Sequence, residues 1–145
     1  MTGDRPSRPK RLWGIAILNI AAALLSISFL LAVFLRFPAG LRPDALSAAL
    51  TLFLGVTLIV SCVLALIGHP FARWLALGCA IVFFGVRLIN VALLLSQDRG
   101  LLPSLGMTSE VRDAILNNSL VIVLNLWSFL SDKTDIYFEA SRERP

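Results

Sequence analysis

The sequence has little charge, and this shortage excludes several classes of protein. Charged residues make up only 15% of the 145 residues, whereas a typical soluble domain has about 25%. Apolar residues reach 57%, and the mean hydropathy is +0.82. A water-soluble globule does not fit these values, and most of the chain is too apolar to be disordered. The composition therefore indicates an integral membrane protein.

Residues that carry catalytic and redox chemistry are scarce as well. The sequence has one histidine, His69, and two cysteines, Cys62 and Cys79, without a CxxC spacing. The usual patterns of zinc, thiol-redox and haem sites are therefore absent. The sequence also lacks an HExxH motif, a phosphate-binding glycine loop and acidic residues within its apolar segments. We therefore predict that the protein is not an enzyme and binds no cofactor and no metal.

The sequence does contain four long apolar segments. About 20 helical residues cross a hydrocarbon core of about 30 Å, and the first three segments reach that length. The fourth is uncharged for only 18 residues, from Ala114 to Ser131, but Thr108 or Ser109 can cap a helix that begins earlier. We predict an all-α, integral membrane four-helix bundle with helices at about 13–35, 45–68, 74–96 and 110–131.

The apolar segments divide the chain into three parts. Residues 1–12 form a basic tail that we expect to be disordered, and residues 13–131 form the transmembrane domain. Residues 132–145 form a C-terminal cytoplasmic tail, which is either a short helix at the membrane surface or a solvated end; its apolar residues are Ile136, Tyr137 and Phe138. A cleaved signal peptide is the alternative for the first segment, but its 23 apolar residues exceed the usual length of about 7–15.

Basic residues predict the orientation. Four crossings with short connections give an up-down-up-down bundle with both tails on one side. Eight basic residues fall on that side, namely Arg5, Arg8, Lys10, Arg11, Arg73, Lys133, Arg142 and Arg144, and four on the other, namely Arg36, Arg42, Arg99 and Arg112. Because basic residues are retained in the cytoplasm, both termini are predicted to be cytoplasmic. The net charge of +4 thus orients the chain and does not indicate nucleic-acid binding.

Two further patterns concern the membrane itself. Trp13, Trp74 and Trp127 all fall near the predicted cytoplasmic boundary, as an interfacial aromatic belt requires. The chain has 11 arginines and only 2 lysines, a bias typical of bacteria with GC-rich genomes. We therefore predict a multi-pass protein of the bacterial inner membrane.

Arg87 is the one charged residue inside an apolar segment. It lies 13 residues after Trp74, or about 20 Å along the helix, in the outer half of the membrane. Asn90 follows three residues later on the same helical face. Asn117 and Asn118 enter the fourth helix at a similar level. We predict an outer polar cluster of Arg87, Asn90 and Asn118, with Asn117 as a further candidate.

This cluster has two interpretations. Arg87 can be structural, if it reaches lipid phosphate or a loop carboxylate; the candidate carboxylates are Asp98, Glu110 and Asp113. Alternatively, it belongs to a site for an anion or a lipid headgroup. The sequence leaves both possibilities open.

Asn19 and Asn125 form a second candidate pair. Each lies six residues from the cytoplasmic end of its helix, so both are about 9 Å deep. The first and fourth helices are neighbours in a closed bundle. We therefore predict an interhelical hydrogen bond between the two amides and favour it over a contact with a substrate.

The leading functional hypothesis is a non-enzymatic accessory or structural subunit that binds another membrane protein. The alternatives are a homo-oligomeric transporter or channel for an anionic or polar solute, and a lipid-binding membrane module. The expected partners are membrane lipids and either another membrane protein or a second copy of the chain; nucleic acid is not expected.

Overall fold

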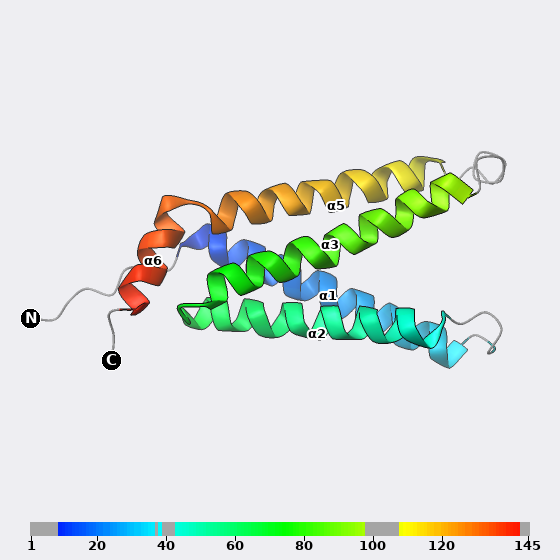
Figure 1. The fold of residues 1–145 in the computed structure, drawn as a ribbon, viewed down its shortest axis with the longest axis horizontal. Coiled ribbons are helices and arrows are strands. Elements are labelled where there is room, and N and C mark those ends of the chain that lie inside the picture. The colour runs from blue at the N-terminus through cyan, green and yellow to red at the C-terminus, as the bar shows by residue number, and fades with distance from the viewer. Residues whose placement is uncertain (1–8, 37, 39–42, 98–107, 143–145) are drawn as a thin grey trace, which may run out of the picture.

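The computed structural model describes residues 9–36, 38, 43–97 and 108–142, which form five helices and no strand. The helices are α1 (Lys10–Arg36), α2 (Ala45–Ile67), α3 (Ala72–Gln97), α5 (Thr108–Phe129) and α6 (Asp132–Arg142), as Figure 1 shows. The prediction of an all-α fold is confirmed. Three helices are long and apolar enough to cross a membrane: α1, α2 and α3, the last over Ala72–Leu93.

The fourth predicted span is less uniform than the sequence suggested. In α5, polar residues interrupt the apolar run, including Asn117, Asn118 and Asn125. Val111–Phe129 meets the length and hydropathy criteria only together with Asp132–Ala140, to which it is joined with a bend of 54°. The described part of the chain therefore has three candidate spans, or four if the bent pair is one span.

Helix α1 begins earlier than the predicted tail allows. The expected disordered tail covered residues 1–12, but Lys10 to Leu12 are helical and the first helical hydrogen bond runs from the Trp13 amide to the Pro9 carbonyl. Leu12 is 1% exposed and belongs to the core. Its burial stabilises the first turn, which the local charge pattern does not reveal. The remainder of that tail, residues 1–8, lies outside the described residues.

Local signals in the sequence set both ends of α2. Asp44 is the N-cap, and its carboxylate accepts a hydrogen bond from the Ser47 amide at 3.0 Å. Gly68 follows the helix with a φ of 87°, and the amides of Gly68 and His69 both donate to the Leu64 carbonyl. This left-handed conformation favours glycine and turns the chain directly into α3.

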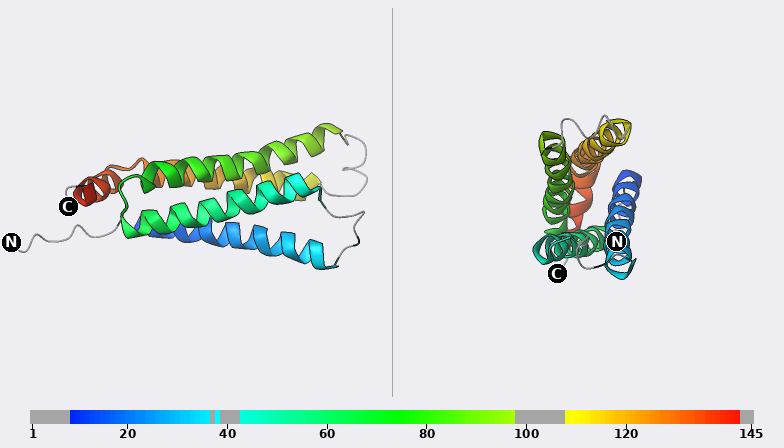
Figure 2. Two further views of the ribbon diagram at one scale, coloured as in Figure 1. Left: turned by 60° about the horizontal axis from the view of Figure 1, so that its bottom comes forward. Right: turned by 90° about the vertical axis from the view of Figure 1, so that its right-hand side faces the viewer.

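The long helices are close together at one end and diverge toward the other (Figures 1 and 2). At the first end α1 begins and α6 lies; we call it the α6 end, and the opposite one the distal end. Toward the distal end the pair of α1 and α2 separates from the pair of α3 and α5. Helix α1 packs mainly on α2, and α3 packs on both α2 and α5.

The buried core occupies the half of the bundle at the α6 end. No described side chain of α1 after Ala23 is buried, nor any of α2 before Gly55 or of α3 after Phe84. Alanines allow the helices to approach closely in this half, at positions 16, 23, 65, 72, 76 and 80. The distal half therefore contains space between the helices.

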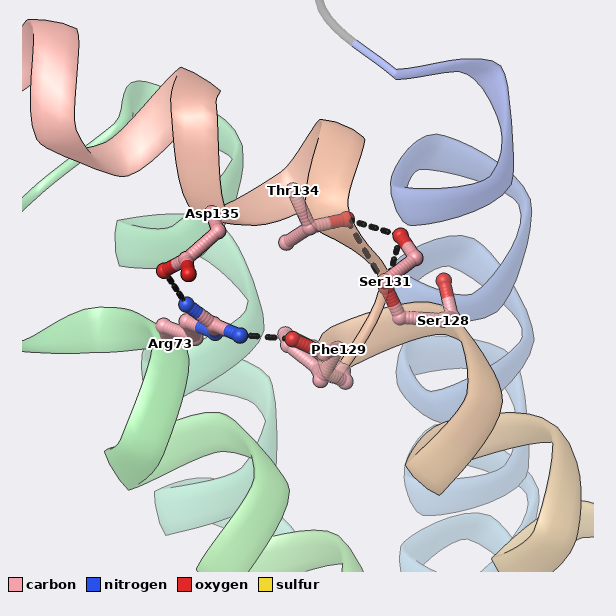
Figure 3. A network of polar contacts seen from close by, with 6 residues as sticks. All are labelled: Arg73, Ser128, Phe129, Ser131, Thr134 and Asp135. Carbon is pink, nitrogen blue, oxygen red and sulfur yellow. Dashed lines mark hydrogen bonds and ion pairs between the residues drawn. The ribbon is translucent and has the colours of Figure 1, made fainter.

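A polar network fixes α6 across the end of the bundle (Figure 3). Arg73, at the start of α3, donates from Nε to the Phe129 carbonyl at 2.7 Å and from Nη1 to the Asp135 carboxylate. Phe129 ends α5 and Asp135 lies in the first turn of α6, so one guanidinium joins three helices. The Thr134 hydroxyl also donates to the Ser128 carbonyl at 2.8 Å. These contacts satisfy carbonyls at the end of α5 that lack helical partners.

The network also places the aromatic residues of the C-terminal segment. Tyr137 and Phe138 are 7% and 3% exposed and pack on the core, whereas Ile136 is 59% exposed. The Tyr137 hydroxyl approaches the Leu66 carbonyl at 3.4 Å. The segment is helical, and two of its three apolar residues pack on the core; its place at the membrane surface stays a prediction.

We predict that Arg73→Gln releases α6 from the bundle. The substitution removes a charge-assisted bond to a buried carbonyl, and bonds of this kind contribute about 1.5–3 kcal/mol. Hydrogen exchange of the α6 amides, measured in detergent, should become about tenfold faster. The control is Arg112→Gln, because Arg112 pairs with Asp113 at 3.4 Å on an exposed surface. Unchanged exchange in the Arg73 variant would show that the network does not hold α6.

Candidate functional site

A cleft of about 660 Å³ lies between α1, α2 and α3. It lies where the core has ended, beyond Ala23 and Phe84. Its lining is mostly apolar and includes Phe29, Leu54 and Phe83. Volumes of this size are typical of pockets for small molecules. We call this space the distal cleft.

Two side chains give the distal cleft its polar character, Arg87 and Asn90 of α3. The Arg87 guanidinium carbon lies 5.7 Å from the centre of the Phe83 ring, within the range of a cation–π contact. No described residue accepts a hydrogen bond from Arg87 or forms an ion pair with it. Asn90 likewise has no hydrogen-bond partner among the described side chains. The cleft thus presents one cation and one amide to whatever enters it.

The two hydroxyl groups of the cleft are already bonded within their own helices. Ser26 donates to the Ala22 carbonyl at 2.8 Å, and Thr51 donates to the Ser47 carbonyl at 2.9 Å. This leaves oxygen lone pairs, which accept but do not donate. The donors available to a ligand in the described part of the cleft are therefore those of Arg87 and Asn90.

The structure does not bring the other predicted members of the outer cluster to Arg87. The Asn118 amide donates to the Ala114 carbonyl of its own helix at 2.7 Å, and Asn117 is exposed. Neither residue lines the distal cleft. Of the predicted outer cluster of four, only Arg87 and Asn90 line this cavity.

Of the carboxylates expected near Arg87, only that of Asp113 belongs to the described side chains, and it does not pair with Arg87. Asp113 pairs with Arg112 at 3.4 Å. Asp98 and the side chain of Glu110 lie outside the described residues.

Asn19 and Asn125 lie together at the centre of the core. Asn19 Nδ2 donates to Asn125 Oδ1 at 2.7 Å, and Asn125 Nδ2 donates to Asn19 Oδ1 at 3.1 Å. Both residues are 0% exposed. Asn125 donates in addition to the Val121 carbonyl at 2.8 Å, and Asn19 approaches the Cys62 sulfur at 3.8 Å. The pair is fully enclosed and joins α1 to α5, so its geometry is that of a structural contact.

The sequence did not indicate two contacts at the α6 end. One is the network around Arg73, which was counted only as a basic residue. The other is the stacking of Arg11 on Trp127, with the guanidinium carbon 4.1 Å from the ring centre. Both join residues distant in sequence, and no local pattern marks them.

No group of three or more histidine, cysteine and acidic residues in the described chain is arranged to hold a metal ion. The chain matches no known protein family, no curated protein and no solved structure. The proposals below therefore depend on the sequence and the geometry alone.

We predict that Asn19 and Asn125 are coupled in stability. Removal of one partner leaves the other amide buried without its bonds, whereas removal of both leaves two apolar side chains. Asn19→Leu and Asn125→Leu should each destabilise the bundle, and the double variant should be less destabilised than the sum. The expected coupling is about 0.6–2 kcal/mol. Unfolding of the three variants in mixed micelles measures it, and simple additivity would contradict the prediction.

Proposed function

We propose that the chain is a non-enzymatic accessory protein of the bacterial inner membrane whose distal cleft binds an amphiphile with an anionic headgroup. Three apolar helices of sufficient length support the membrane location. The single observation that carries the ligand class is that Arg87 lines a mostly apolar cleft and has no ion-pair partner among the described residues. This proposal keeps the accessory role expected from the sequence and adds the lipid-binding role that was one of its alternatives.

The proposed topology has four spans in up-down-up-down order, with the α6 end in the cytoplasm. The bent pair of α5 and α6 supports a fourth span that ends at the membrane surface. Arg11 and Arg73 both lie at the α6 end, in agreement with the retention of basic residues in the cytoplasm. The distal cleft then faces the outer leaflet.

We predict the corresponding result from topology reporters. Alkaline phosphatase, which is active only in the periplasm, should be active when fused at Gly100 and inactive when fused after Pro145. Green fluorescent protein at the same two positions should give the opposite pattern. A periplasmic signal from the C-terminal fusion would refute the orientation.

The chemistry of the distal cleft favours an amphiphile over a small ion. An arginine in the hydrocarbon region costs about 2.5–3.5 kcal/mol on insertion scales, so an anionic partner stabilises it strongly. The guanidinium offers two parallel N–H donors to a phosphate group. The aromatic and aliphatic walls suit an acyl chain and contribute nothing to binding a hydrated anion. Asn90, one turn from Arg87, can donate to an ester or phosphate oxygen.

We predict that Arg87→Gln lowers the affinity for phosphatidylglycerol about tenfold, because a charge-assisted hydrogen bond is lost. Native mass spectrometry of the full chain in mild detergent measures the bound lipid. Phosphatidylcholine serves as the zwitterionic comparison. The matched control is Arg36→Gln, because Arg36 is exposed at the distal end of α1 and does not line the cleft.

Equal losses in the two arginine variants would refute a specific site. A stoichiometric foreign subunit that is lost with Arg87→Gln would place a partner helix in the cleft and overturn the lipid assignment. Flux of an anion through liposomes that depends on Arg87 would favour the transporter alternative.

A further inference from the structure

A second cavity lies at the α6 end, far along α1 from the distal cleft. It is a groove of about 190 Å³ between α1 and α5, lined by Arg11, Gly14, Ile15, Leu18, Leu124, Trp127 and Ser128. We call it the basal groove. It shares no lining residue with the distal cleft, so evidence for one is independent of the other.

Ser128 gives the basal groove an unpartnered polar group. The residue is only 2% exposed, and its hydroxyl has no hydrogen-bond partner among the described residues. Its backbone carbonyl, in contrast, accepts from Thr134 and Ser131. In Figure 3 the dashed hydrogen bonds from those two side chains reach the Ser128 carbonyl, and none reaches its hydroxyl. A buried hydroxyl is normally hydrogen-bonded, and no described residue accepts the proton of this one.

Arg11 supplies a cation at the entrance of the same groove. Its guanidinium carbon lies 4.1 Å from the centre of the Trp127 ring, and no described residue accepts a hydrogen bond from its N–H groups, which can bind an anion. The first turn of α1, which begins at Lys10, adds the positive end of the helix dipole. Trp127 is 55% exposed, as suits a residue at the level of lipid headgroups.

Gly14 leaves the groove open between these groups. A Cβ atom placed on Gly14 would have no neighbour within 4 Å. Ile15, Leu18 and Leu124 provide an apolar floor that continues away from Arg11. A phosphate beside Arg11 would therefore have its acyl chain directed along this floor.

We propose that the basal groove binds a phospholipid with an anionic headgroup from the cytoplasmic leaflet. Arg11 binds the phosphate, and the Ser128 hydroxyl donates to a phosphate or glycerol-ester oxygen. The inference relies on the proposed orientation for the choice of leaflet and not on the ligand of the distal cleft. The shared feature of both cavities is a cation above an apolar wall.

The test uses Trp127 as a reporter within the site. The full chain carries Trp13→Phe and Trp74→Phe, so that Trp127 alone fluoresces, and is placed in vesicles of phosphatidylcholine. Brominated phosphatidylglycerol or brominated phosphatidylcholine is then added as quencher. We expect quenching by the anionic lipid at about tenfold lower concentration than by the zwitterionic lipid.

Three variants should weaken or abolish the preference for the anionic lipid, and each has a matched control. Arg11→Gln should abolish it, whereas Lys10→Gln, which removes the same charge one residue away, should not. Ser128→Ala should reduce it severalfold, whereas Ser61→Ala should not, because the buried Ser61 hydroxyl already donates to the Leu58 carbonyl. Gly14→Leu should block the groove, whereas Gly78→Leu, at an equally open position on α3, should have no effect.

The outcomes separate the possible explanations. Equal quenching by the two lipids would overturn the proposal, as would equal effects of the Arg11 and Lys10 variants. Loss of the preference in inorganic phosphate, with sulfate of equal ionic strength as control, would show that the site takes a free anion and not a lipid. Arg87→Gln should leave the preference unchanged, so failure at the distal cleft is recognised separately.

Discussion

The reciprocal hydrogen bonds between Asn19 and Asn125 are the constraint on which the closure of the bundle depends. Helix α1 packs mainly on α2, and α5 packs mainly on α3, so the amide pair is the principal polar link between the two halves. An amide buried without partners costs several kcal/mol in an apolar medium, which gives the pair a strong preference for one register of α1 against α5. The bundle is therefore closed at this level.

Closure does not extend to the distal end. Around the amide pair and toward the α6 end, alanines line the contacts between helices and allow the helices to approach closely. Beyond Ala23, α1 carries larger and exposed side chains such as Leu25 and Phe29, which border the distal cleft. No described polar pair joins the helices there. The helix pairs separate there, and Arg87 lines the cavity without an ion pair to any described carboxylate.

Much of the fold follows from simple features of the sequence. Apolar runs long enough to cross a membrane locate α1, α2 and α3, and equal depth from the helix ends suffices to pair Asn19 with Asn125. Equal depth in the membrane was not sufficient to predict which residues of the outer cluster lie together. Asn118 lies at a level similar to that of Arg87, but the rotation of α5 directs its amide to the Ala114 carbonyl.

The contacts at the α6 end could not be predicted either, because they also depend on how the helices are oriented. The Arg73 network depends on the 54° bend between α5 and α6, and no periodicity or charge count encodes that angle. The stacking of Arg11 on Trp127 depends on the same closure that the asparagine pair sets. Such contacts follow from the angles and rotations of the helices, which hydropathy does not specify.

Ser128 connects the structural network to the proposed lipid site. Its carbonyl is held by Thr134 and Ser131, so the docking of α6 determines the orientation of its backbone. Ser128 is also among the residues that line the basal groove. Arg73 binds the next carbonyl along the chain, that of Phe129. The end of α5 is thus fixed from one side by α6 and α3. In the proposed site, this rigidity holds the buried Ser128 hydroxyl at a constant position. A headgroup bound there would in turn favour the docked position of α6, because binding and docking act on the same residue.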